Sequence, residues 1–347
     1  MSSFHATAGE APRRILMLVY PDVLLLDFGG PAQVFEQANE LAREAGQPEP
    51  YRIELASLTG GIVPTDIGFG VNTMKSGDDD GPIDTLLIPG GPGIWSQIDA
   101  GDLTRHIAMR ARRSRRIAAV CIGAFLAGAA GLLDGRRAVT HWRHCADLAR
   151  RHPDTTVEVD PIFLQDGPLW TSAGVSAGID LALALVEVDL GHAMAIGVAR
   201  RLVVFLKRPG GQAQFSAALA AQQADGAGRF DRLHAWMAEN LAGDLRVDQL
   251  AEQAGMSVRS FIRTYPAATG RTPAKAVELL RIEAAKRLLV TARLPIATIA
   301  HLSGFGDDER LRRAFQRSLG ITAEDYRARF AAYLPSSSRV TARVSLP

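Results

Sequence analysis

LRVDQLAEQAGMSVRSFIR, residues 245–263, is the stretch that decides the fold of the carboxyl-terminal third of this chain. Leu250 and Ala251 belong to an apolar series with helical spacing. Gly255 can supply the left-handed residue of a tight turn, and Ser257 can cap a second helix after it. The pattern therefore predicts a helix-turn-helix unit.

A second copy of this pattern follows about fifty residues later, in IATIAHLSGFGDDERLRRAF, residues 296–315. It repeats the apolar spacing and the turn glycine, Gly304, and it has a helix-start signal at Asp307 or Asp308. Between the copies, Pro273 to Leu289 predicts one amphipathic helix that begins with a proline, which the first turn of a helix tolerates. We expect an all-α domain with two helix-turn-helix motifs.

Length and charge divide the chain into two parts. A chain of 347 residues exceeds one typical core and predicts two domains. From Arg229 onward there are 19 Lys and Arg against 12 Asp and Glu, whereas residues 1–228 have 20 against 25. A basic carboxyl-terminal third beside an acidic remainder is typical of a DNA-binding module joined to a module that does not bind DNA.

The cysteines and the apolar runs indicate the compartment. Cys121 and Cys145 are too few for a disulfide framework and fit a reducing environment. The amino terminus lacks the basic start and apolar run of a signal peptide. The longest apolar segments, such as Ile179 to Val188, fall short of the roughly 20 residues that a membrane span needs. We expect a cytoplasmic protein without a membrane partner.

The first two thirds of the chain alternate apolar strand patterns with helical patterns. After Pro31, a helical series places Val34, Phe35 and Ala38 on one face. This alternation predicts a doubly wound α/β sandwich of the flavodoxin-like kind. The strand candidates are Arg14 to Tyr20, Tyr51 to Leu58, Asp84 to Ile88, Ile117 to Val120, Val157 to Phe163 and Leu169 to Thr171.

Cys121 stands at a sharp turn between the strand that ends at Val120 and a predicted helix from Ala124 to Leu132. A nucleophile at such a strand-to-helix turn resembles a nucleophile elbow. The helix macrodipole is expected to lower the pKa of a thiol at this position.

Residues 245–330 resemble the paired helix-turn-helix domain of the AraC/XylS family of transcription regulators. The resemblance rests on Leu250-Ala251, Gly255-Met256-Ser257, Thr269-Gly270-Arg271-Thr272-Pro273, Arg281-Ile282-Glu283-Ala284-Ala285, Ile299-Ala300, Gly304-Phe305, Arg313-Ala314-Phe315, Leu319-Gly320 and Tyr326-Arg327. It implies binding to double-stranded promoter DNA. Arginine can pair with guanine and carboxylates can accept a hydrogen bond from cytosine, although the same arginines could contact phosphates only. The candidate DNA-binding residues are Arg259, Ser260, Arg263, Asp308, Glu309, Arg310 and Arg313.

Two residues depart from the AraC pattern. Pro266 falls near the end of the first recognition helix, where proline is expected to kink or end the helix and to weaken that copy. Ala323 stands at a helix start where the family commonly has proline. We therefore expect the second copy to make the firmer DNA contact.

Residues 13 to about 212 resemble the ThiJ/PfpI superfamily, which is related to class I glutamine amidotransferases. The matching segments are Leu26-Asp27-Phe28-Gly29-Gly30-Pro31, Ile88-Pro89-Gly90-Gly91, Ala119 to Phe125, Gly131 to Trp142 and Trp170 to Asp180. The resemblance implies Cys121 as nucleophile, Asp27 as acid or base, and an oxyanion hole from the backbone N–H groups of Gly91 and Ile122. His141 would orient the pocket.

The residue after the cysteine separates two functions for this domain. Hydrolases of the superfamily usually have histidine there, and the related isocyanide hydratases have threonine, whereas this chain has Ile122. We therefore expect a site that is no longer catalytic, in which Asp27, Gly91, Cys121, Ile122 and His141 bind a small effector. The alternative is a cysteine-dependent amidase or isocyanide hydratase-like enzyme with an accessory DNA-binding module.

A metal site is a weaker hypothesis. His141, His144 and Cys145 have the spacing of one helical face, but an isolated His-x-x-His pair is more often a surface or core feature. Cys145 is better explained as a small buried apolar residue. We expect neither a metal nor a cofactor.

Together these features predict a transcription regulator, most simply an activator, that responds to an effector and forms a homodimer, with RNA polymerase as a further candidate partner. The predicted division of the chain is a disordered start (1–12), the ThiJ/PfpI-like domain (13–207), a linker (208–228), the AraC-type domain (229–332) and a disordered tail (333–347). The acidic run at residues 77–82 is expected to be a surface loop.

Overall fold

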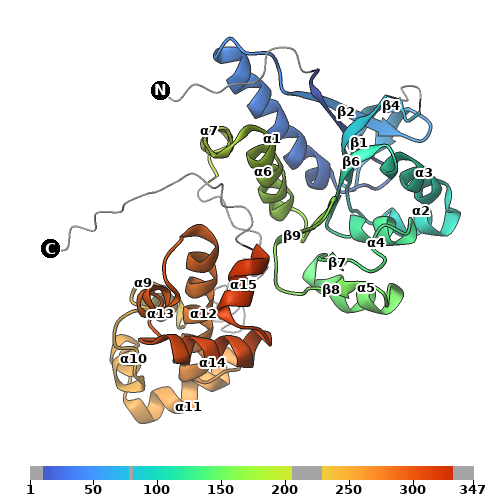
Figure 1. Cartoon of the computed structure of the whole chain (residues 1–347). Coiled ribbons are helices and arrows are strands. Elements are labelled where there is room, and N and C mark those ends of the chain that lie inside the picture. Colours follow the sequence, from blue (N-terminus) through green and yellow to red (C-terminus); the bar gives the residue numbers. More distant parts are fainter. Residues whose placement is uncertain (1–10, 78–80, 205–228, 331–347) are drawn as a thin grey trace.

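The computed structural model describes residues 11–77, 81–204 and 229–330, which form an α/β body and a helical body (Figure 1). The predicted linker and the predicted disordered tail lie outside the described residues, as do most of the predicted disordered start and the centre of the acidic run at 77–82. None of the helices in the described part of the chain is both long enough and apolar enough to cross a membrane.

The α/β body is built on an eight-stranded sheet. Its strands are β1 (Arg13–Leu18), β2 (Tyr51–Ser57), β3 (Gly61–Pro64), β4 (Gly70–Lys75), β5 (Ile83–Ile88), β6 (Ser114–Val120), β9 (Phe163–Asp166) and β10 (Leu169–Ser172). They lie in the order β3-β4-β2-β1-β5-β6-β10-β9. The pairs from β4 to β10 are parallel, and the edge strands β3 and β9 are antiparallel to their neighbours. The doubly wound sheet is thus confirmed, with two antiparallel edges that were not predicted.

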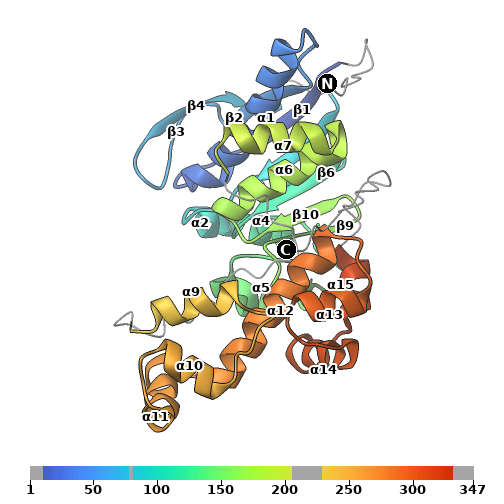
Figure 2. The same cartoon turned by 90° about the vertical axis from the view of Figure 1, so that its left-hand side faces the viewer.

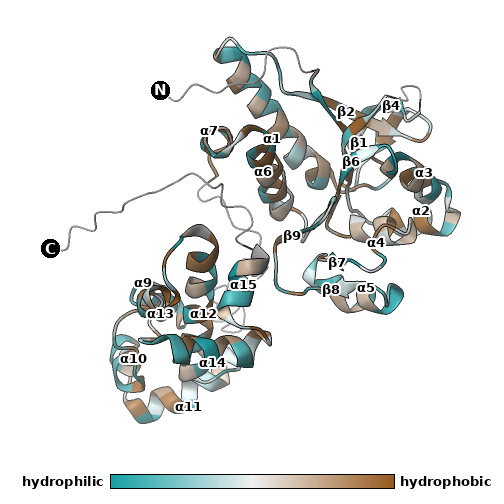
Figure 3. Ribbon diagram, in the orientation of Figure 1, coloured by the Kyte–Doolittle hydropathy of each residue, from teal (hydrophilic) through white to brown (hydrophobic). Residues whose placement is uncertain are grey.

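Helices cover both faces of this sheet (Figures 1 and 2). One layer consists of α1 (Leu25–Glu44), α6 (Ser176–Leu190) and α7 (His192–Arg201), and the other of α2 (Ile94–Ala100), α3 (Asp102–Ala111) and α4 (Gly123–Ala129). The central strand β1 is buried along most of its length, as a parallel strand covered on both faces must be. Helix α6 is correspondingly apolar around its circumference, as its brown colour shows (Figure 3).

The predicted strand Val157 to Phe163 is wrong. The chain instead forms the short strand β8 (Thr156–Val157), which pairs with β7 (Arg137–Ala138), and then enters β9 at Phe163. Between these strands Pro161 has no backbone N–H to donate to a ladder, and Val159 and Asp160 are exposed. The segment therefore crosses from one sheet to the other as a loop.

The helical body contains two copies of a helix pair joined by one long helix. Its helices are α9 (Asp231–Glu239), α10 (Val247–Gln253), α11 (Val258–Thr269), α12 (Pro273–Thr291), α13 (Ile296–Leu302), α14 (Asp308–Leu319) and α15 (Ala323–Phe330). The first half of α12 is buried in a core with α9, α10 and α11, and its second half in another core with α13, α14 and α15. The two predicted helix-turn-helix motifs and their connecting helix are confirmed.

The helix starts follow the predicted signals. The side chains of Ser257, Thr272 and Asp307 each accept a hydrogen bond from a backbone N–H of the turn that follows. At Ala323 the absent proline is compensated by Thr322 and Asp325, which cap each other's backbone N–H at 3.0 and 3.2 Å.

Pro266 does not end the first recognition helix. Helix α11 continues through Pro266 to Thr269 and ends at Gly270, whose N–H donates to the carbonyl of Pro266 at 2.9 Å. The helix is held because Phe261 and Tyr265 are buried in the core beneath it. Tertiary packing therefore outweighs the hydrogen bond that proline cannot make.

Candidate functional site

Cys121 lies at the carboxyl end of β6, where the chain turns sharply into α4. Its φ of 57° is left-handed, a conformation that a side chain makes unfavourable. Two hydrogen bonds hold it there: its N–H donates to Ser172 O at 3.0 Å, and the Thr140 hydroxyl donates to its carbonyl at 2.8 Å. The predicted elbow is thus present.

Asp27 lies beside the elbow, although the sequence did not show that these two residues meet. Helix α1 begins at Leu25, six residues before the predicted series at Pro31, and Asp27 is therefore in its first turn with no exposed surface. Its carboxylate accepts the backbone N–H groups of Val175 at 2.8 Å and Gly90 at 3.1 Å, and the thiol of Cys121.

Burial is the largest cause of the pKa shifts of both Asp27 and Cys121. Burial raises the pKa of Asp27 to about 6, against the lowering effect of the N–H groups of Val175 and Gly90. Burial, and then the negative charge of Asp27, raise the pKa of Cys121 far above its ordinary value. The expectation that the helix macrodipole would lower this thiol pKa is wrong, because desolvation and a neighbouring carboxylate outweigh the short helix α4.

Gly174 and Val175 close the site from the end of β10. A Cβ on Gly174 would lie 2.2 Å from the Cβ of Cys121, so only glycine fits there. Val175 has a φ of 50°, an unusual conformation for a β-branched residue, and it directs its N–H at Asp27. Left-handed backbone at both Cys121 and Val175 shows that the surrounding contacts fix this geometry firmly.

The remaining elbow candidates have different surroundings. Gly90 leads from β5 toward Gly91, and a Cβ on it would come within 2.9 Å of both Asp27 and the backbone nitrogen of Ile122. The His141 ring accepts the N–H of Arg143 and lies against the rings of Trp142 and His144. Burial and then the nearby positive charges lower the pKa of His141.

The proposed metal ligands do not share one helical face. Trp142–His144 form a 3-10 turn and Cys145 starts the separate helix α5 (Cys145–Arg151). Cys145 is buried, as expected. Among the described residues, no three His, Cys, Asp or Glu side chains gather where they could hold a metal ion.

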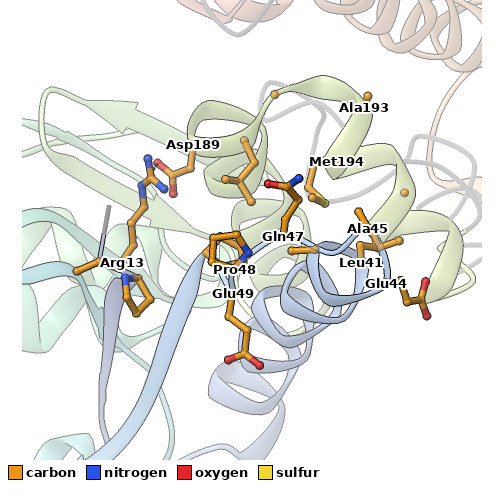
Figure 4. Close-up of a pocket in the computed structure, with 17 residues that line it drawn as sticks. Arg13, Leu41, Glu44, Ala45, Gln47, Pro48, Glu49, Asp189, Ala193 and Met194 are labelled. Carbon is orange, nitrogen blue, oxygen red and sulfur yellow. Dashed lines mark ion pairs between the residues drawn. The ribbon is translucent and has the colours of Figure 1, made fainter. Parts of the chain in front are cut away.

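A cavity of about 790 Å³, which the sequence did not indicate, lies at the opposite end of the sheet (Figure 4). It opens where β1 and β2 begin, between the end of α1 and the start of α7. Apolar side chains such as Leu41 and Met194 line it, and Arg13 and Asp189 lie at one side. Segment 47–50, which contains two prolines and borders the cavity, is a local sequence feature that could have suggested it.

The recognition helices α11 and α14 lie on the side of the helical body that faces away from the sheet (Figures 1 and 2). Arg259 and Arg263 are exposed on α11, one helical turn apart. Ser260 is half-buried, and its N–H donates to the Ser257 cap at 3.3 Å. Between the two arginines, Ile262 is 53% exposed, which is unusual for an apolar side chain and was not among the candidates.

Helix α14 carries a denser polar face, as its teal colour shows (Figure 3). Arg310 pairs with the cap residue Asp307, with 3.3 Å between Nε and Oδ2, and Asp308 is exposed. Glu309 accepts hydrogen bonds from Arg313 and from Arg312, each at 2.7 Å. These two arginines lower the pKa of Glu309 to about 2.

Arg312 and Gln316 were missed by the sequence analysis, although both are exposed on α14. Their helical spacing from Glu309 and Arg313 could have indicated them. Arg317 has a different role, because it donates to Glu278 of α12 at 2.6 Å and ties α14 to the connecting helix.

Comparisons with known proteins give a match for both the α/β body and the helical body. The Helix-turn-helix domain model matches residues 250–329, and the DJ-1/PfpI family model matches residues 13–188. The HTH-type transcriptional regulator GbdR of Pseudomonas aeruginosa is 25% identical over 317 residues, which cover 91% of this chain and 84% of that protein. An isonitrile hydratase of Pseudomonas putida is 29% identical over 180 residues, 51% of this chain and 72% of that enzyme. The crystal structure of a THiJ/PfpI family protein from Pseudomonas syringae has a TM-score of 0.51 and 25% identity, and covers 60% of this chain and 84% of its own.

An α/β sandwich with a cysteine elbow, joined to a pair of helix-turn-helix motifs, defines a class of DNA-binding transcription regulators. The chain belongs to the DJ-1/PfpI family, in the form that carries an AraC-type helix-turn-helix domain. That family also includes enzymes, such as the isonitrile hydratase, so the role of the elbow has to be argued from its chemistry.

Proposed function

We propose that this regulator binds promoter DNA through α11 and α14 when a small effector occupies the elbow end of its α/β domain. It acts in the cytoplasm as a homodimer and activates transcription through contact with RNA polymerase. The observation that carries the proposal is the combination of two capped helices that carry exposed arginines with a buried thiol that is hard to ionise.

The exposed arginines support base reading in the major groove. Arg259, Arg263 and Arg310 are exposed on helices whose N-terminal ends are fixed by capping side chains. A helix of this kind can enter the major groove, where arginine pairs with guanine. Arg313 would have to exchange its bond to Glu309 for a bond to DNA, so Glu309 is proposed to restrict this arginine to well-matched sites.

The DNA proposal is tested with sites that the full-length protein selects from genomic fragments. Arg310→Ala and Arg313→Ala are each expected to weaken binding by about 1–3 kcal/mol, measured by fluorescence anisotropy at fixed salt. Arg150→Ala is the matched control, because Arg150 is an equally exposed arginine on α5 of the other body. Equal affinity of all three variants and the parent would contradict base reading by α14.

The elbow chemistry supports binding rather than turnover. A cysteine nucleophile must be a thiolate, and both burial and Asp27 oppose ionisation of Cys121. Asp27 is the only carboxylate described as bonded to the thiol, and its pKa lies far below that of the thiol, so it is a poor base for this proton. The backbone geometry of the elbow is therefore preserved, although its thiol is hard to ionise.

The effector proposal is tested by a thermal-shift screen of metabolites. Cys121→Ser is expected to leave reporter output largely unchanged, since serine keeps the size and hydrogen-bonding groups of the side chain and the thiol has no chemical step to perform. Ala193→Trp fills part of the cavity in Figure 4 from an exposed position on α7 and serves as the control. A ligand whose shift is abolished by Ala193→Trp alone would place the effector in that cavity and overturn the elbow assignment.

The alternative function is a cysteine-dependent amidase or isonitrile hydratase, favoured by the intact contact between Asp27 and Cys121. Its test is turnover of a panel of amides and isocyanides by the purified full-length protein. Release of ammonia or formamide that Cys121→Ser abolishes would overturn the non-catalytic proposal.

A further inference from the structure

An ion pair between described residues joins the two bodies directly. The ammonium Nζ of Lys286, on α12, lies 2.9 Å from Oδ2 of Asp160, which belongs to the loop between β8 and β9. The Lys286 side chain is only 5% exposed, whereas that of Asp160 is 51% exposed. A buried cation therefore depends on a carboxylate supplied by the other body.

The surroundings of Lys286 strengthen this contact. Its ammonium lies 5.6 Å from the centre of the Tyr326 ring on α15, within the range of a cation–π interaction. Burial, and then the charges of Asp160 and Glu158, raise the pKa of Tyr326. Glu158 accepts a hydrogen bond from Arg137 of its own body at 2.7 Å, and Asp160 accepts the bond from Lys286.

The Asp160 loop, residues 158–162, is fastened to the elbow at both ends. At its start the N–H of Glu158 donates to Ala138 O at 2.8 Å, two residues before Thr140, whose hydroxyl holds the carbonyl of Cys121. At its end the carbonyl of Ile162 accepts the N–H of Ala173 at 2.7 Å, directly before Gly174, which contacts Cys121. The ends of this loop are therefore hydrogen-bonded to the segments that hold Cys121 in place.

We propose that the Asp160 loop is the coupling element of this regulator: it docks on α12 and α15 through the Asp160–Lys286 pair, and occupation of the elbow changes that docking. The recognition helices α11 and α14 lie on the far side of the helical body, so docking leaves them open to DNA (Figure 2). The inference rests on the proposed function for its purpose, but the docking and its link to the elbow can be measured without DNA or effector.

The difference in burial between Lys286 and Asp160 suggests a specific test. Removal of Asp160 leaves a buried cation without its carboxylate, which is much less favourable than replacement of both partners by uncharged groups. Asp160→Asn is therefore expected to loosen the docking, whereas the double variant Asp160→Asn/Lys286→Met is expected to restore it by packing an apolar side chain on Tyr326.

Hydrogen–deuterium exchange of the full-length protein reports the docking. In Asp160→Asn, exchange of peptides 158–163 and 282–290 is expected to rise together by roughly tenfold. Asp147→Asn is the matched control, because it breaks the exposed pairs of Asp147 with Arg150 and Arg151 on α5. Unchanged exchange in Asp160→Asn, or an equal rise in Asp147→Asn, would overturn the docking.

The link to the elbow is tested by Thr140→Val, which removes the hydroxyl that holds Cys121 and leaves the ion pair intact. Exchange of peptides 158–163 is expected to rise severalfold. Thr104→Val, which removes a partly buried bond from Thr104 of α3 to the carbonyl of its N-cap Gly101, is expected to leave it unchanged. A loop that responds to Asp160→Asn but not to Thr140→Val would refute the coupling. Failure of the protein to bind DNA or an effector would instead refute only the proposed function.

Discussion

Asp27 holds the elbow together, although its buried position disfavours a negative charge on its carboxyl group. It has no exposed surface, it accepts two backbone N–H groups, and its pKa is raised to about 6 because burial outweighs those bonds. The site therefore holds a carboxyl group that changes its charge in the slightly acidic range.

We predict that the α/β domain becomes less stable as the pH rises from about 4 to about 6. The folded carboxyl group retains its proton in this window while the unfolded one loses it, so the unfolded state gains relative stability. A shift from 3.8 to about 6 corresponds to a loss of at most about 3 kcal/mol. Urea unfolding followed by tryptophan fluorescence measures this loss.

Asp27→Asn cannot titrate and provides the control for this prediction. Its free energy of unfolding should lack this component of the pH dependence, although the substitution is expected to lower stability overall because one amide oxygen cannot replace both carboxylate oxygens as acceptors of the two N–H groups. Parallel pH profiles for the parent and the variant would show that Asp27 does not have a raised pKa.

The two helix-turn-helix units are alike in their capping and turns but differ in how tightly the turn is packed. The second turn passes close to the end of α9, because a Cβ on Gly304 would lie 1.9 Å from Leu241 O. Arg281 of α12 donates to the same carbonyl at 3.1 Å. The second unit is thereby fixed against the first at the level of the backbone.

We predict that Gly304→Ala destabilises the helical body by at least about 3 kcal/mol, since left-handed strain and a backbone clash add. Gly320→Ala is the matched control, because Gly320 has a φ of 70° but open space around its Cβ position. It should cost about 1–2 kcal/mol. Similar losses in urea unfolding followed by circular dichroism would contradict the close packing at Leu241.

A separate prediction concerns α11. Pro266→Ala supplies the N–H that proline lacks and is expected to stabilise the helical body by about 1–2 kcal/mol in the same unfolding measurement. Pro295→Ala is the control, because Pro295 is the N-cap of α13, a position whose backbone N–H makes no bond within the helix. A destabilised Pro266→Ala would show that the proline ring makes packing contacts that matter more than the missing bond.

At the scale of the whole molecule, the two parts of the chain differ in net charge. The chain from Arg229 onward has 19 Lys and Arg against 12 Asp and Glu, although the whole protein has a net charge of only +2. Helix α12, with 19 residues at about 1.5 Å each, is about 28 Å long, somewhat less than the roughly 34 Å of one turn of DNA.

We predict that hydroxyl-radical footprints of a selected site show two protected regions about one helical turn apart on one face of the duplex. The logarithm of the binding constant should fall linearly with the logarithm of salt concentration, because bound phosphates release counterions. Arg259→Ala should reduce this slope by about 1 if it contacts phosphate. A single protected region would mean that only one unit enters the groove.

Most of the features that the sequence by itself determined follow from the chemistry of neighbouring residues. The doubled helix-turn-helix, the caps at Ser257 and Asp307 and the alternation of strands and helices all depend on residues close together in the chain. Such patterns are readable because helix capping and apolar periodicity are local properties. The strand predicted at 157–163 failed because local propensity could not show that the chain leaves one sheet for another there.

Only the tertiary structure decided the chemistry of the elbow and the contact between the bodies. Asp27 meets Cys121 across 94 positions of sequence and Asp160 meets Lys286 across 126, and neither pairing leaves a local pattern. The pKa of Cys121 is raised rather than lowered because it depends on burial and on a carboxylate brought in from α1. Desolvation and electrostatic interaction depend on distance in space, and the fold alone sets those distances.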